Sequence, residues 1–318
     1  MAIPPTPIYQ RNITTFDNLA QTIELGRRLI IVRHGERVDR CFQKGMPDWL
    51  HKMFPNKQTG AYSRINMNMP RRCVLRGKKD DEYGLLDYKS DSPLTTLGEG
   101  TAERLGSRIL GSNLKITRVY CSPALRCMQT CNRLLQGFCE ATTGGQDAAT
   151  IKKQYAMNIE PGIFDFTGFS ESSLMIPTLL TADFMIDRHM YINKDYKPGL
   201  SLDNLQAGED VKEFYPRVQK AIDKILKDTE TERHASILVV THGPVMDGIC
   251  QLLLKQPPRT EAMFPKVANY PPYLATMVME ENIAPKSSLK WRLAPPPIKS
   301  FTHLINLNFE WKKLTDKK

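Results

Sequence analysis

Three short, mostly apolar runs along the chain predict the strands of a buried sheet. They cover residues 29–32, 116–121 and 236–241, and the first shows no polar alternation. Such runs are typical of central parallel strands that helices cover on both faces. The two later runs are each followed within a few residues by a proline, Pro123 and Pro244, which suits the first turn of a helix. The pattern therefore predicts repeated strand–turn–helix units.

Two further segments, residues 97–110 and 210–227, are predicted to be helices that lie between the strands in sequence. No internal repeat interrupts this alternation of strands and helices. The predicted fold class is α/β, as a three-layer α/β/α sandwich with a mostly parallel central sheet.

The chain of 318 residues is expected to form one large domain, residues 29–318, after an N-terminal arm, residues 1–28. The arm mixes prolines and polar residues with one weakly apolar stretch. Three stretches with scattered glycines, prolines or charges, 40–92, 141–150 and 255–300, are predicted to be irregular. We expect the first and last of these to be insertions that shape the mouth of the substrate site.

Composition narrows the class of protein and of partner. Hydrophobic residues make up 41% and charged residues 25%, which is ordinary for a soluble globular protein. The net charge of +10 favours anionic partners such as phosphates. The basic residues are spread along the chain without a basic stripe and interleaved aromatics, so nucleic-acid binding is not expected.

Cysteines and apolar runs indicate the compartment. The seven cysteines form an odd set without C-x-x-C pairs, which favours a reducing environment. The first ten residues hold three prolines and no apolar core of a signal peptide, and no run approaches the roughly 18 apolar residues of a membrane span. The sequence therefore predicts a cytoplasmic protein with no membrane span.

Each of the three predicted strands ends in basic or imidazole side chains. Arg33, His34 and Arg37 follow the first strand, Arg126 follows the second, and His242 follows the third. Because ligands of open parallel sheets bind beyond the carboxyl ends of the strands, we expect these side chains to converge. Any one of them alone is more often a solvated or core residue. Their coincidence at three strand ends predicts a phosphate pocket.

Such a pocket suits phosphoryl transfer. Guanidinium groups and helix N-termini stabilise the negative charge on the transferred phosphoryl oxygens. Neighbouring positive charge lowers the pKa of an imidazole, so that it stays neutral and can attack phosphorus at neutral pH. The leaving alkoxide or phenoxide then needs a carboxylic acid within reach to supply a proton.

Two other kinds of phosphatase chemistry fit the sequence less well. Cys121 and Arg126 are separated by four residues, whereas the phosphate loop of cysteine phosphatases needs five, so Cys121 is predicted to be a buried strand residue. His34 and His242 have no third ligand at metal-binding spacing, so neither a metal nor a cofactor is expected.

At Arg33-His34-Gly35-Glu36 the sequence resembles the histidine phosphatase superfamily, whose fold is termed phosphoglycerate-mutase-like. Further segments follow the motif order of that family: 91–95 with Gly98, 120–130, 160–164, 208–209 and 241–242. Three more segments resemble the phosphatase domains of the suppressor of T-cell receptor signalling proteins and of ecdysteroid-phosphate phosphatase: 66–70, 272–274, and 295–297 with 309–311. The likeness extends over roughly residues 29–314.

The resemblance implies a role for each matched residue. His34 becomes the nucleophile and Glu160 the acid that protonates the leaving group and later activates water. The phosphate clamp that it implies consists of Arg33, Arg37, Arg126 and His242. Nothing local singles out Glu160, which without the resemblance reads as a solvated loop carboxylate.

The resemblance assigns supporting roles to other positions. Ser122 is expected to present strand backbone to the pocket, Glu36 to orient its neighbours, and Glu209 to play a structural part. Phe166 and Phe169 follow Glu160 where the relatives carry tryptophan, and they are interpreted either as leaving-group contacts or as core packing.

The implied function is hydrolysis of a phosphate monoester, either protein phosphotyrosine or an apolar, steroid-like phosphate. A non-catalytic protein of the same fold that binds a phosphorylated ligand is an alternative, and a phosphoglycerate-type mutase is a weaker one. The signalling relatives carry ubiquitin-associated and SH3 domains ahead of this region, whereas fewer than thirty residues precede Leu29 here, so adaptor functions are not expected. A homodimer is one option, because dimers are common in the proteins that the chain resembles.

Overall fold

The computed structural model describes residues 25–42, 46, 48–56, 61–71, 73, 88, 91–111, 115–143, 155–168, 190–268, 270–284 and 290–295. Among them a single six-stranded sheet runs in the order β3-β2-β4-β1-β5-β6. The strands are β1 (Leu25–Arg33), β2 (Arg118–Cys121), β3 (Asn158–Ile159), β4 (Ser236–Thr241), β5 (Thr276–Asn282) and β6 (Trp291–Ala294). The first four in this order pair in parallel, while β5 pairs antiparallel with β1 and with β6. The predicted α/β class with a mostly parallel sheet is confirmed.

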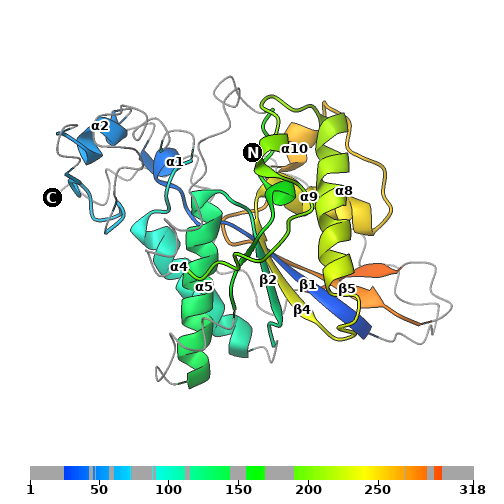
Figure 1. The fold of residues 1–318 in the computed structure, drawn as a ribbon. Coiled ribbons are helices and arrows are strands. Elements are labelled where there is room, and N and C mark those ends of the chain that lie inside the picture. The colour runs from blue at the N-terminus through cyan, green and yellow to red at the C-terminus, as the bar shows by residue number, and fades with distance from the viewer. Residues whose placement is uncertain are drawn as a thin grey trace, which may run out of the picture.

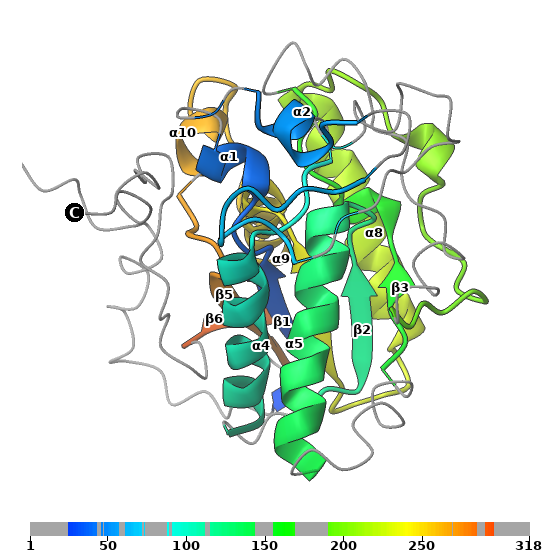
Figure 2. The same ribbon diagram turned by 90° about the vertical axis from the view of Figure 1, so that its left-hand side faces the viewer.

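Helices cover the sheet on both faces, as Figure 1 shows. On one face lie α4 (Thr96–Gly111) and α5 (Leu125–Thr143), and on the other lie α8 (Val211–Asp228), α9 (Gly243–Leu253) and α10 (Phe264–Ala268). Two short helices, α1 (Val38–Phe42) and α2 (Trp49–Met53), sit beyond the end of the sheet at which β2 points upward in Figure 2. Two 3₁₀ turns, η2 (Pro161–Ile163) and η4 (Leu202–Asn204), complete the described elements.

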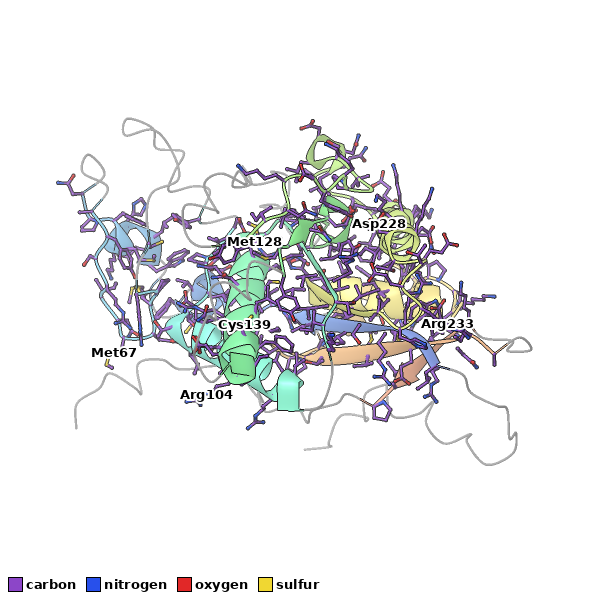
Figure 3. All side chains as sticks on the ribbon, turned by 60° about the horizontal axis from the view of Figure 1, so that its bottom comes forward. Met67, Arg104, Met128, Cys139, Asp228 and Arg233 are labelled. Atoms are coloured by element: carbon purple, nitrogen blue, oxygen red, sulfur yellow. The ribbon has the colours of Figure 1, made fainter. Side chains whose placement is uncertain are left out.

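Strand β1 supplies side chains to two separate apolar layers. Ile30 and Val32 belong to the layer beneath α4 and α5, whereas Leu29 and Ile31 belong to the layer beneath α8 and α9. All four side chains are fully buried, which explains why the run lacks polar alternation. Figure 3 shows the side chains of both layers filling the space between the sheet and the helices, with Met67 projecting from the outer edge.

The predicted helices and strands agree with the structure, with differences at their ends. Strand β4 has the predicted bounds, and α8 begins after a capping box between Asp210 and Glu213. Pro244 lies in the first turn of α9, but Pro123 precedes α5, whose first residue is Leu125. Strand β1 starts at Leu25, so its first four residues fall in the predicted arm; residues 1–24 of that arm lie outside the described residues.

The largest difference between the predicted and the observed elements is in the segment 255–300. It was predicted to be irregular because of its prolines, yet it holds α10, β5 and β6. The segment 40–92 likewise contains α2 and the last turn of α1, and the first residues of 141–150 belong to α5. Within the parts of the chain that the structure describes, no helix is long and apolar enough to cross a membrane.

Candidate active site

The carboxyl ends of β1, β2 and β4 meet at one edge of the sheet. The backbone N–H of His34 donates to the carbonyl of Thr241 at 2.9 Å, and that of Ser122 donates to the carbonyl of Val240 at 3.0 Å. These bonds continue the parallel pairing of β1 and β2 with β4 by one residue. The backbones of the three strand ends therefore lie side by side, as predicted.

The two histidines at these ends face each other. The ring centroids of His34 and His242 are 5.3 Å apart, and the two residues are 2% and 0% exposed. The Nδ1 atom of His34 lies 2.9 Å from the carbonyl oxygen of Gly35. Because a carbonyl can only accept, we assign the hydrogen to Nδ1, which leaves the lone pair on Nε2. Nε2 is thus the ring nitrogen of His34 whose lone pair could attack phosphorus.

The environment of His34 keeps its ring neutral. Burial, followed by the positive charges of Arg126 and Arg33, lowers the pKa of His34 well below its ordinary value. A neutral imidazole with a free lone pair on Nε2 is the state that can attack phosphorus. The sequence predicts this lowering of the pKa from neighbouring charge alone, whereas in the structure the loss of solvent is the larger cause.

His242 is held by contacts on both ring nitrogens. Its Nε2 lies 2.8 Å from Ser122 Oγ, and its Nδ1 lies 3.2 Å from an Nη atom of Arg126. The same Nδ1 lies 3.3 Å from a carboxylate oxygen of Asp165. Burial and the nearby arginines, Arg126 first, lower the pKa of His242 well below its ordinary value. Ser122 therefore contributes its side chain, in addition to the predicted backbone.

The three predicted arginines surround the histidines and are held by different partners. Arg33 lies 4.9 Å from the ring of Tyr273, which is itself 5.7 Å from the ring of His34. Arg37 forms a two-pronged ion pair with Asp39 at 2.7 and 2.9 Å. These partners orient the guanidinium planes before any ligand is present.

Arg126 joins the second strand end to the histidines. Its Nη atoms contact Asp91 at 3.4 Å and Asp165 at 2.8 Å. The Nε atoms of Arg126 and Arg33 are buried and have no hydrogen-bond partner among the described residues. Unpaired buried guanidinium donors are costly, and an anion bound between them would satisfy them.

Asp165 is the carboxylate that lies beside His242 in this cluster, and the sequence patterns did not predict it. It follows η2 in the loop after β3 and contacts both Arg126 and His242. Burial tends to raise its pKa, but the charges of the arginines, Arg126 first and then Arg37 and Arg33, hold the pKa of Asp165 below its ordinary value. Its position directly after the matched segment 160–164 was the available signal.

Glu160, the predicted proton donor, lies elsewhere. It is fully buried, and its carboxylate accepts bonds from the Tyr196 hydroxyl at 2.7 Å and from the N–H groups of Gly199 at 2.7 Å and Gly162 at 3.0 Å. These bonds connect the end of β3 to the segment around residues 196–200. The Glu160 carboxylate therefore anchors the segment 196–200 to the end of β3. Among the described residues it makes no hydrogen bond or ion pair with His34 or His242.

Two other positions singled out in the sequence, Glu36 and Phe166, make contacts that stabilise the fold. Glu36 accepts bonds from Thr95 at 2.7 Å and Asn68 at 2.8 Å, which fixes the chain after His34. Phe166 packs against the core rings of α8 and α10. Phe169 lies outside the described residues.

Two cysteine thiols near the cluster are unsuited to act as nucleophiles. Cys121 is fully buried, as predicted, and Cys127 Sγ lies 3.4 Å from His242 Nε2. Burial raises the pKa of both thiols, so they remain protonated at neutral pH. The imidazole of His34 is thus the better nucleophile at this site.

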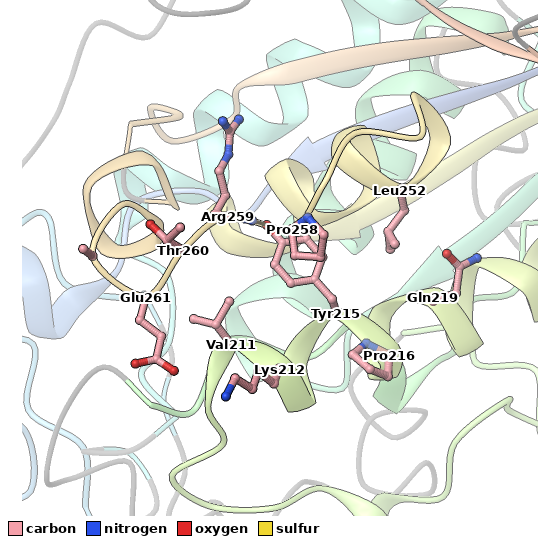
Figure 4. A pocket seen from close by; sticks show the side chains of 11 residues that line it. Val211, Lys212, Tyr215, Pro216, Gln219, Leu252, Pro258, Arg259, Thr260 and Glu261 are labelled. Atoms are coloured by element: carbon pink, nitrogen blue, oxygen red, sulfur yellow. Dashed lines mark hydrogen bonds between the residues drawn. The ribbon is translucent and has the colours of Figure 1, made fainter.

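A cavity of about 890 Å³ lies apart from this cluster, between α8 and the segment that follows α9. Figure 4 shows Tyr215 and Val211 on one side of it, with Leu252, Pro258 and Arg259 on the other. Arg259 forms a two-pronged ion pair with the buried Asp247 of α9. The lining is mainly apolar and includes none of the residues predicted for phosphate binding.

The two neutral imidazoles make the stability of the protein sensitive to acid. In the unfolded chain each histidine takes up a proton with a pKa of about 6.5. The unfolded state therefore binds more protons below that pH, so the free energy of unfolding falls as the pH falls. We expect the free energy of unfolding to drop between about pH 7 and pH 5.5 by up to roughly 1.4 kcal/mol per pH unit for each histidine, and the Tm to fall with it.

The variant His34→Asn tests this expectation by thermal unfolding in a buffer free of phosphate and sulfate. It should lose a substantial part of the acid dependence, because one of the two groups that take up a proton on unfolding is absent. An unchanged slope of Tm against pH in the variant would contradict a neutral His34 in the folded protein.

The fold agrees with comparisons to known proteins. The structure of the ecdysone phosphate phosphatase from Bombix mori, in complex with tungstate, superimposes with a TM-score of 0.65 at 24% identity. The superposition covers 91% of this chain and 99% of the other and shows a shared fold. A sequence model described as Histidine phosphatase superfamily (branch 1) matches residues 79–143 and 180–269. The chain belongs to the histidine phosphatase superfamily.

Relatives of known sequence extend the likeness to most of the chain. Ubiquitin-associated and SH3 domain-containing protein A of Homo sapiens is 30% identical over 306 residues, which cover 96% of this chain and 42% of that protein. Ecdysteroid-phosphate phosphatase of Drosophila melanogaster is 31% identical over 293 residues, 91% of this chain and 34% of that protein. The chain thus spans less than half the length of these relatives.

Proposed function

We propose that this protein hydrolyses phosphate monoesters through a phosphohistidine formed on His34. The observation that carries the proposal is the buried pair of neutral imidazoles, His34 and His242, with three arginines around them and the Asp165 carboxylate beside His242. Membership of the histidine phosphatase superfamily supports it. A site of this kind supplies a nucleophile, positive charge for the phosphoryl oxygens and a group that can carry a proton.

The first step is transfer of the phosphoryl group to the enzyme. The phosphate oxygens are bound by His242 and by the arginines Arg33, Arg37 and Arg126. The Nε2 lone pair of His34 forms a bond to phosphorus while the bond from phosphorus to the ester oxygen breaks. Asp165 gives its proton to that oxygen, and the alcohol leaves.

Substrate binding prepares Asp165 for this task. In the free enzyme the arginines hold the pKa of Asp165 below its ordinary value, so its carboxyl group is ionised at neutral pH. A bound phosphate dianion adds negative charge beside the carboxylate and offsets the arginines, which raises the pKa of Asp165. The proton is thus taken up when the substrate is in place.

The second step is hydrolysis of the phosphohistidine. Asp165, now ionised again, accepts a proton from a water molecule as the water oxygen bonds to phosphorus. The bond from phosphorus to Nε2 of His34 breaks, its electron pair returns to the ring, and inorganic phosphate is released. The same carboxylate therefore serves first as acid and then as base.

We propose that the substrate is an aryl or apolar alkyl phosphate, namely protein phosphotyrosine or a steroid-like phosphate. The name of the Drosophila relative, ecdysteroid-phosphate phosphatase, supports the second class. Phe166 points into the core and does not contribute to this choice. Selectivity then rests on other parts of the mouth, such as Tyr273 beside His34.

A panel of phosphate esters tests both the activity and the substrate class. We expect phosphate release from 4-nitrophenyl phosphate, phosphotyrosine peptides and steroid phosphates, with kcat/KM at least about tenfold lower for sugar phosphates, a difference of about 1.4 kcal/mol. Binding of vanadate without turnover of any ester would instead indicate a phosphate-binding protein. Interconversion of phosphoglycerates would indicate a mutase.

A further inference from the structure

The buried ion pair between Glu209 and Arg217 lies behind the loop that carries Asp165. Arg217 is 8% and Glu209 5% exposed. Arg217 Nε donates to Glu209 Oε2 at 2.8 Å, and one Nη donates to Oε1, so the pairing is two-pronged. Arg217 belongs to α8, whereas Glu209 lies just before that helix begins.

The remaining donors of Arg217 bind backbone carbonyls of the loop that carries Asp165. One Nη donates to the carbonyls of Gly162 at 2.9 Å and Phe164 at 3.0 Å. The other Nη donates to the carbonyl of Asp165 at 3.2 Å. The guanidinium therefore fixes the main chain of Asp165 itself and of the residues that lead to it.

Glu209 fixes the far end of the same loop. Its Oε1 accepts from the N–H of Thr167 at 3.2 Å, and its own N–H donates to the Thr167 hydroxyl at 3.1 Å. That hydroxyl donates in turn to the carbonyl of Gln206 at 2.7 Å. The ion pair thus clamps residues 162–167 on both sides of Asp165.

The loop has little regular structure to hold it in place. Strand β3 has two residues, and η2 is a single turn of three residues. At the same time the carboxylate of Asp165 is drawn toward Arg126 by an ion pair at 2.8 Å. A general acid must lie within hydrogen-bond distance of the leaving oxygen, and a displacement of about 1 Å can cost a hundredfold in rate.

We propose that the Glu209–Arg217 pair is a positioning device that sets the distance between the Asp165 carboxylate and the leaving-group oxygen. Neither residue contacts His34, and the pair acts through the loop backbone. It holds the Asp165 main chain so that the carboxylate stays beside Arg126 and His242, where the phosphate ester is proposed to bind. This inference rests on the proposed function, because it concerns the proton transfer of that reaction.

The variants Arg217→Lys and Glu209→Gln test the proposal, because each keeps a polar side chain but removes the two-pronged clamp. The readout is kcat/KM for phenyl phosphate and 4-nitrophenyl phosphate, which reports the steps through release of the alcohol. Phenoxide needs a proton as it leaves, whereas 4-nitrophenoxide is a weaker base. We expect kcat/KM for phenyl phosphate to fall roughly 10- to 100-fold and that for 4-nitrophenyl phosphate to change less than about threefold.

The chain offers a closely matched control in the ion pair of Arg27 and Glu281. It is two-pronged, with distances of 2.7 and 2.9 Å, and Arg27 also donates to the carbonyl of Leu226. Arg27 is 6% exposed, like Arg217, but lies near the start of β1, at the end of the strand away from His34. Arg27→Lys should lower the Tm by a similar amount and leave the ratio of the two kcat/KM values unchanged.

A double-mutant cycle with Asp165→Asn completes the test. If the clamp acts through Asp165, Arg217→Lys should cause no further loss for phenyl phosphate once that carboxylate is gone. Equal losses for both esters, or additive losses in the double variant, would overturn the proposal. So would unfolding of both clamp variants while Arg27→Lys stays folded, since the pair would then hold the fold. Failure of the wild-type protein to hydrolyse either ester would instead refute the proposed function.

Discussion

Replacing His34 with alanine is expected to lower phosphate release from 4-nitrophenyl phosphate by about 10⁴-fold or more. The reason is that the proposed reaction divides hydrolysis into two displacements that share one nitrogen, and no neighbouring group can substitute for it. Cys127, whose thiol lies beside His242, has its pKa raised by burial, and His242 is held by Ser122 and Arg126. Stopped assays of phosphate release measure the change.

Trapping of the intermediate makes this result specific. Wild-type protein quenched with alkali during turnover of a labelled ester should carry phosphate that is stable to base and released by acid, and His34→Ala should carry none. His234 is exposed, and His234→Ala is the matched control that should keep full activity. Turnover that survives in His34→Ala would rule out the mechanism.

Replacing Asp165 with asparagine is expected to produce the second largest loss. For phenyl phosphate, kcat/KM should fall by about 10²- to 10⁴-fold, the usual contribution of general acid catalysis. For 4-nitrophenyl phosphate the loss should be much smaller, because its leaving group needs little protonation. The comparison of kcat/KM for the two esters therefore measures proton donation separately from phosphate binding.

Glu160→Gln distinguishes the two candidate acids. Because the Glu160 carboxylate accepts from the Tyr196 hydroxyl and from the N–H of Gly199, the variant should mainly lower the Tm. Its effect on kcat/KM should be the same for both esters. A strong dependence on the leaving group in Glu160→Gln, together with none in Asp165→Asn, would restore the assignment that the sequence resemblance implies.

The contrast between these two carboxylates shows where the sequence was insufficient. Residues directly at the ends of long apolar strands, such as His34 and His242, could be predicted to converge because parallel strands end at one edge of a sheet. Asp165 follows a strand of two residues and a 3₁₀ turn, so no apolar run marks its position. Its direction depends on Arg217, 52 residues later in the chain, which no local pattern reveals.

The strands at the antiparallel edge were missed for a different reason. The segment 255–300 was predicted to be irregular from its several prolines, although it also contains the apolar residues of β5. That strand nevertheless forms because it pairs with β1 at Leu25 and, after a shift in register, from Arg28 to Val32. Tertiary pairing of this kind overrides local composition.

The hydrogen bond between Nδ1 of His34 and the Gly35 carbonyl has a chemical consequence. Since Nδ1 is occupied, the proposed reaction phosphorylates Nε2, and its expected intermediate is the tele isomer of phosphohistidine. Two successive in-line displacements at phosphorus each invert its configuration. Hydrolysis of an ester with isotopically chiral phosphorus would therefore proceed with net retention of configuration. The choice of ring nitrogen, and with it the isomer of the intermediate, depends on a single main-chain carbonyl, that of Gly35.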